Sequence, residues 1–85
     1  MLIVIHHKMS DAGKFWGAAQ ANLATCPKDL KLVGSFPGTD GVNAVCLWDA
    51  PAVAPLRDYL EPIVGSVSKN EYFEMDATKA MGLPT

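Results

Sequence analysis

The chain has 85 residues and a net charge of −2, and 49% of its residues are hydrophobic whereas only 19% are charged. A chain of this length forms one domain, residues 1–85, with a thin core of its own, and the absence of a basic run argues against a nucleic-acid partner. The apolar runs are too short for a membrane helix or a signal peptide, so we expect a cytoplasmic protein without a membrane partner.

The first predicted strand covers residues 2–8 and is apolar on both faces from Leu2 to Ile5. A strand of this kind lies in the middle of a sheet and needs a covering layer on each side. Because strand side chains alternate, His6 and His7 must point to opposite faces of the sheet.

Two helices are expected. Apolar residues at helical spacing predict the first over residues 11–25, and Ser10 is the expected N-cap. The second starts near residues 52–54, where prolines suit the first turn. Pro62 should kink or end it near Glu61, because proline cannot donate a hydrogen bond to the preceding turn.

The remaining strands are expected at about 30–36, 42–48 and 68–76, and the turn residues of 37–41 should close a hairpin between the first two of these. The order strand, helix, strand, strand, helix, strand is that of the ferredoxin-like βαββαβ arrangement, an α+β fold with antiparallel sheet order 4-1-3-2. This order makes the first and third strands central. The third strand is also apolar on both faces from residue 44 to 48, which supports the same order.

Two helices can cover only one face of such a sheet. We therefore expect a second copy of the chain to cover the other face, in a homodimer or a dimer of dimers, and the excess of apolar residues agrees with self-association. The tail, residues 77–85, contains Met81 and Leu83 and is expected to lie against a surface, with a partner chain as one possibility.

Two stretches carry a resemblance to a known group of proteins. HHKMSD at 6–11, followed by Phe15 and Trp16, is similar to the start of the first helix in small members of the dimeric α/β-barrel superfamily. VCLWDAP at 45–51 resembles a segment of small uncharacterised and nickel-responsive ferredoxin-like proteins. The resemblance covers residues 2–76 and implies two ferredoxin-like chains packed sheet against sheet. The superfamily includes cofactor-free monooxygenases, isomerases, haem-dependent enzymes and binding proteins, so it implies a fold and not one activity.

Strand parity divides the candidate site residues between the two faces. If Met9 and Trp48 lie under the helices, His7 and Cys46 face the helices as well, and His6 faces the second copy. A nucleophilic pair of Cys46 and His7 is one alternative for the helix side.

For the last strand, we expect Phe73 and Met75 to pack against the helices, which places Tyr72 and Glu74 on the face of His6. His6, Tyr72 and Glu74 would then form a polar cluster in an apolar cavity, as in many small-ligand sites. These three residues are the predicted ligand-binding residues.

Three functions remain open. The preferred one is binding of a small hydrophobic or aromatic molecule, in a cavity between sheet and helices or between two sheets, because catalytic groups are sparse. The second is a cofactor-free monooxygenase or isomerase with His6 as catalytic base and Tyr72 orienting the substrate. The third is a nickel-type metal site formed by His6 and Glu74. The sequence contains no phosphate-binding loop and no paired-cysteine motif, so no cofactor is expected.

Overall fold

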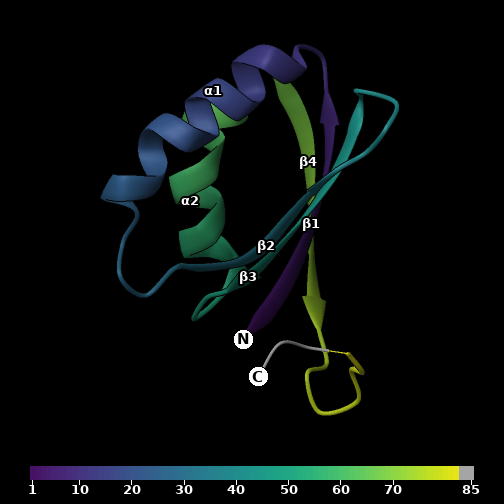
Figure 1. Ribbon diagram of the computed structural model, residues 1–85. Helices are drawn as coiled ribbons and strands as arrows, with labels where there is room; N and C mark the ends of the chain where they lie inside the picture. Colours follow the sequence, from purple (N-terminus) through teal and green to yellow (C-terminus); the bar gives the residue numbers. More distant parts are fainter. Residues whose placement is uncertain (83–85) are drawn as a thin grey trace.

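The computed structural model describes residues 1–82, which form one layer of helices on one layer of sheet (Figure 1). The elements are β1 (Leu2–Met9), α1 (Ala12–Asn22), the 3₁₀ helix η1 (Leu23–Thr25), β2 (Lys31–Pro37), β3 (Asn43–Asp49), α2 (Val53–Val64) and β4 (Ser68–Met75). The sheet order is β2-β3-β1-β4, and every neighbouring pair is antiparallel. This is the predicted order 4-1-3-2 read from the opposite edge, so the predicted α+β arrangement is confirmed.

The two central strands turn the expected residues toward the helices. Ile3 and Ile5 are fully buried and His7 is 2% exposed, whereas Val4 and His6 between them are only half-buried. Across the strand pair, Ile5 lies opposite Cys46, which is also buried. Burial thus follows the period of two that a strand imposes, and the predicted faces of β1 and β3 are correct.

The predicted faces of β4 are wrong. Tyr72 lies opposite Ile5 and therefore faces the helices, whereas Phe73 lies opposite Val4 on the other side of the sheet. The physical reason is that the open face of the sheet is itself apolar, so hydrophobicity did not distinguish the two sides of this edge strand. The buried residue at its start is a serine, Ser68, whose hydroxyl donates to the carbonyl of Val64 in α2.

Helix α1 begins one residue later than predicted, because Asp11 and not Ser10 is its N-cap. The Asp11 backbone is extended, and its carboxylate accepts a hydrogen bond from the Lys14 backbone N–H at 3.1 Å. That carboxylate satisfies one of the N–H groups that have no partner within the first turn of a helix.

Helix α2 continues past Pro62 to Val64, so of the two predicted effects of Pro62, a kink or an end near Glu61, the end is wrong. Pro62 and Asp58, four residues before it, are both exposed. The carbonyl that loses its helical partner is therefore next to solvent, where water can replace the missing donor. Among residues 1–82, no helix has both the length and the apolar character needed to cross a membrane.

Both helices lie on the same side of the sheet, and no element between residues 1 and 82 covers its other side (Figure 1). We call this second side the open face. Its apolar side chains are Leu2, Val4, Phe36, Val45, Leu47, Phe73 and Met75. Phe36 and Phe73 remain 60% and 45% exposed, respectively.

The tail leaves the sheet after β4 and makes a turn around Asp76, whose carboxylate accepts from the Thr78 backbone N–H. Met81 is 95% exposed, so it does not pack on its own chain. Leu83 lies outside the described residues, and a contact between the tail and a partner chain stays a prediction.

Replacing Asp11 with alanine should lower the free energy of unfolding by about 1 kcal/mol, because the first turn of α1 loses its side-chain acceptor. Chemical denaturation measures this change. Ser10→Ala is the matched control, and it should alter stability by less than about 0.5 kcal/mol. A larger loss from Ser10→Ala than from Asp11→Ala would contradict the assignment of the cap.

Candidate functional site

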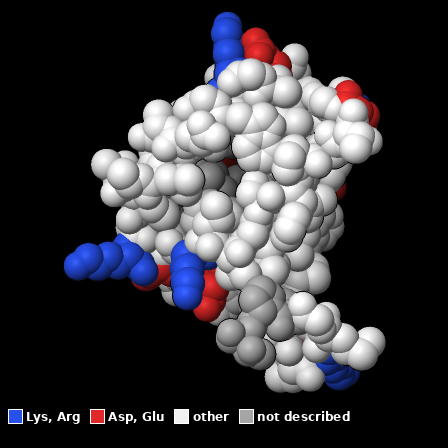
Figure 2. All heavy atoms as spheres, in the orientation of Figure 1, with Lys and Arg blue, Asp and Glu red and all other residues white. Residues whose placement is uncertain are grey.

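A cavity of about 190 Å³ lies between the helix layer and the sheet. Its position corresponds to a hollow in a face of the molecule with few charged side chains (Figure 2). Residues from both helices and from three strands line it: His7, Phe15, Trp16, Ala19, Gln20, Leu23, Leu32, Ser35, Cys46, Trp48, Tyr59, Leu60, Ile63 and Val64. The lining is mainly apolar and contains no Lys, Arg, Asp or Glu.

The cavity exists because α1 presents a small side chain where it crosses the sheet. Phe15, Ala19 and Leu23 follow one another at intervals of four residues and all line the cavity. Residues at this spacing share one face of a helix. The methyl group of Ala19, between two large side chains, leaves space that a leucine would occupy.

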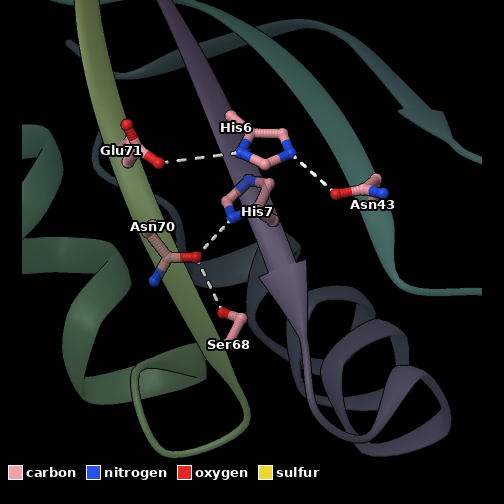
Figure 3. A network of polar contacts seen from close by, with 6 residues as sticks. All are labelled: His6, His7, Asn43, Ser68, Asn70 and Glu71. Carbon is pink, nitrogen blue, oxygen red and sulfur yellow. Dashed lines mark hydrogen bonds and ion pairs between the residues drawn. The ribbon is translucent and has the colours of Figure 1, made fainter.

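His7 lies on the cavity wall and is held from behind by a chain of polar groups (Figure 3). Its Nδ1 is 2.6 Å from Oδ1 of Asn70, the residue opposite it on β4. The Asn70 amide donates in turn to the Glu61 carboxylate of α2, at 2.7 Å. The Ser68 hydroxyl lies 2.7 Å from the same Asn70 oxygen.

These contacts determine which nitrogen of His7 carries the proton. The Glu61 carboxylate can only accept, so the Asn70 NH₂ group must face it and the Asn70 oxygen must face His7. Nδ1 of His7 is therefore the donor, and Nε2 of the neutral ring keeps its lone pair. Burial lowers the pKa of His7 from its ordinary 6.5, and this outweighs the raising effect of the Asn70 hydrogen bond. The ring also packs on Phe15, with 4.8 Å between centroids.

Two further polar groups belong to the cavity wall. Sγ of Cys46 is 3.3 Å from Oγ of Ser35, and burial raises the pKa of the Cys46 thiol. A thiol of this kind is a poor nucleophile, which weighs against the pair of Cys46 and His7. Trp48 is 4% exposed, and its indole N–H has no hydrogen-bond partner among residues 1–82. A buried donor without a partner is uncommon in proteins.

His6 lies on the open face, away from the cavity, as its parity predicted. Nε2 of His6 is 2.9 Å from Oδ1 of Asn43, and Nδ1 is 4.0 Å from the Glu71 carboxylate (Figure 3). The Asn43 amide donates to Asp40, so its oxygen must accept and Nε2 of His6 must donate. The two adjacent histidines therefore donate to their asparagine partners from different ring nitrogens, on opposite faces of the sheet.

The structure does not bring the predicted ligand-binding residues together. Tyr72 and Glu74 lie on the helix side of β4, and His6 lies on the other side of the sheet. Tyr72 is covered by Arg57, whose guanidinium carbon is 5.1 Å from the ring centroid, and burial raises the pKa of Tyr72 to about 12. His6 and Glu74 therefore cannot share a metal ion within one chain, and residues 1–82 contain no group of three or more metal-ligand side chains.

Sequence reasoning missed Asn70 and Glu61, which position His7. Glu61 is half-buried and accepts from Asn70. The signal was present in the predicted sheet order, which pairs the first strand with the last. Residues two apart on a strand share a face, so an assignment of Tyr72 to the helix side would also have placed Asn70 on that side, next to His7.

No protein family, no curated protein and no solved structure matches this chain in the comparisons with known proteins. The superfamily resemblance of residues 6–11 and 45–51 therefore stays a prediction.

The pKa of His7 predicts how stability depends on pH. In the folded chain His7 resists protonation, whereas in the unfolded chain it takes up a proton near its ordinary pKa of 6.5. Protons therefore favour the unfolded chain, and stability contributed by neutral His7 is lost as the pH falls below 6.5. As the pH falls below 6.5, the free energy of unfolding should decrease by up to about 1.4 kcal/mol per pH unit.

Denaturant titrations at several pH values measure this slope. The slope should be shallower in His7→Gln, while the matched control His6→Gln should keep it, because that change leaves His7 in place. An unchanged slope in His7→Gln would show that another group causes the pH dependence.

Proposed function

We propose that this protein binds a small apolar or aromatic molecule in the cavity between its helices and its sheet. The observation that carries the proposal is the cavity itself, about 190 Å³ in a domain of 85 residues. A dry engineered cavity of about 150 Å³ is large enough to bind benzene.

The lining favours an aromatic ligand. Phe15, Trp16 and Trp48 contribute ring surfaces, and aromatic rings interact favourably with one another edge to face. The indole N–H of Trp48, which has no partner in residues 1–82, offers one hydrogen bond to a ligand atom. An apolar wall with a few polar groups is the usual composition of a small-molecule site.

Binding fits the cavity better than nucleophilic catalysis does. Burial disfavours the thiolate of Cys46, and the Tyr59 hydroxyl is already engaged as a donor to the Asn22 carbonyl at 2.9 Å. The catalytic role of His6 stays a prediction, and it would require a substrate on the open face and not in this cavity.

Filling the cavity should abolish binding without damaging the fold. Ala19→Leu places a larger side chain between Phe15 and Leu23, and we expect it to raise the free energy of unfolding by about 0.5–2 kcal/mol, as cavity-filling changes commonly do. In wild-type protein, 4-ethyltoluene should raise the melting temperature with increasing concentration, because it binds only the folded chain. In Ala19→Leu this shift should disappear.

The matched control is Ala21→Leu, the same change at an exposed position of α1. It should leave the ligand-induced shift intact. If neither 4-ethyltoluene nor 4-ethylphenol raises the melting temperature of the wild-type protein, the proposed function is wrong.

We further propose that the open face is covered by a second copy of this chain in a symmetric dimer. Support comes from its centre, where Val4, Val45 and Leu47 form an apolar surface on adjacent strands. The tip of the Phe36 ring lies close to Gly34, since a Cβ atom built there would be 2.7 Å from Cζ of the ring. Charged residues such as Lys8 and Asp49 lie toward the two ends of the strands, and an apolar centre with a polar rim is typical of protein interfaces.

The area of the open face agrees with such a dimer. Four strands about 4.8 Å apart, with seven or eight residues at about 3.3 Å each, give a face of roughly 480 Å² in plan. The relief of the side chains increases the accessible area toward the roughly 600–800 Å² per partner of small specific interfaces. A twofold axis lets one apolar patch pair with its own copy.

A charge in the middle of the open face should separate the dimer. Val45 is 38% exposed on the central strand β3. In a single chain the carboxylate of Val45→Glu would be hydrated, whereas in the dimer two such carboxylates would be buried, which is strongly unfavourable. Sedimentation velocity at micromolar concentration should give a dimer for wild type and a monomer for Val45→Glu. Ala21→Glu, on the exposed side of α1, is the control and should remain dimeric. A wild-type monomer would rule out the proposed dimer.

A further inference from the structure

The hydrogen bonds of His7 to neighbouring residues fix which of its ring nitrogens can accept a hydrogen bond from a ligand. Nδ1 of His7 donates to Asn70, and the Asn70 amide donates to Glu61, so moving the ring proton to Nε2 would place two acceptors, Nδ1 and the Asn70 oxygen, against each other. No hydrogen bond joins Nε2 of His7 to any atom of residues 1–82. His7, whose side chain lines the cavity, therefore has an imidazole nitrogen with a free lone pair.

We propose that the ligand carries a neutral O–H or N–H group, and that His7 recognises this group by accepting its hydrogen bond at Nε2. This inference rests on the proposed function, since it assigns the chemistry of the molecule that occupies the same cavity. His7 is then the residue that sets ligand specificity, and Asn70 and Glu61 are positioning residues that act through it.

A charged ligand does not fit the same wall. A carboxylate or phosphate would bring its lone pairs toward the lone pair of His7, and the lining contains no Lys or Arg to balance the negative charge. Transfer of an unpaired ion into such surroundings is strongly unfavourable. A purely apolar ligand would fit the space but would leave His7 without a partner, which costs binding energy when a buried acceptor is desolvated. Phenols, indoles and similar weakly acidic aromatic molecules meet both requirements.

Two isomeric probes isolate the donor group. 4-Ethylphenol can donate a hydrogen bond, whereas 4-methylanisole has the same composition but can only accept. Both molecules have one oxygen that can accept from the indole N–H of Trp48. A difference between their affinities therefore reports on the hydrogen bond that only 4-ethylphenol can donate to His7. Calorimetric titration of wild-type protein should give 4-ethylphenol a dissociation constant about tenfold lower, as expected for one additional hydrogen bond.

The same pair should then be titrated against His7→Leu, which keeps a similar side-chain volume but removes the acceptor. The preference for 4-ethylphenol should fall by about tenfold, whereas the affinity for 4-methylanisole should change little. Equal affinity of the two isomers for the wild-type protein, or an undiminished preference in His7→Leu, would overturn the inference.

A measurement on wild-type protein covers the case in which His7→Leu does not fold. With ¹⁵N-labelled histidine, the Nε2 resonance of His7 should shift when 4-ethylphenol binds and stay nearly unchanged with 4-methylanisole. His6, on the opposite face, is the internal control. If both isomers and 4-ethyltoluene bind but the Nε2 resonance does not respond, only the inference about the donor fails. If none of the three binds, the proposed function fails with it.

Discussion

The central strands of this sheet are apolar on both faces, but the two helices cover only one of them. Ile3 and Ile5 are sealed under the helix layer, whereas Val4, between them, lies on the open face. Exposed apolar surface of this extent is unfavourable in water, at roughly 25 cal/mol for each Å². The rest of the molecule depends on this imbalance, because it creates one closed side that holds a cavity and one open side on which apolar side chains such as Phe36 and Phe73 remain exposed.

On the closed side, the cavity results from a helix that is held by few large side chains. Phe15 is the only fully buried residue of α1, and small residues such as Gly17 and Ala19 follow it. Glycine weakens a helix by about 1 kcal/mol, so α1 depends on its packing more than on its own propensity. Incomplete packing is costly in a domain of this size, where the core is thin.

The two adjacent histidines show how alternation gives neighbouring residues different chemistry. His6 and His7 are identical side chains one residue apart, but a strand sends them to opposite faces. His7 is desolvated under α1 and has its proton fixed on Nδ1 by Asn70, while His6 has its proton fixed on Nε2 by Asn43. At both histidines an amide, whose own orientation is set by a carboxylate, determines which ring nitrogen donates, and of the two histidines His7 lines the cavity.

The sequence alone determined the element order, the central position of β1 and β3 and their inward and outward faces, because hydrophobic periodicity and turn residues are local properties. It also indicated that one side of the sheet would lack cover. It did not determine the faces of β4, since both sides available to Phe73 are apolar, and a one-residue shift in register exchanges the two faces. That choice decides whether Asn70 reaches His7. Only the tertiary structure could therefore place the candidate site, because a cavity and a three-residue polar chain arise from side chains that are distant in sequence and meet only when the layers pack.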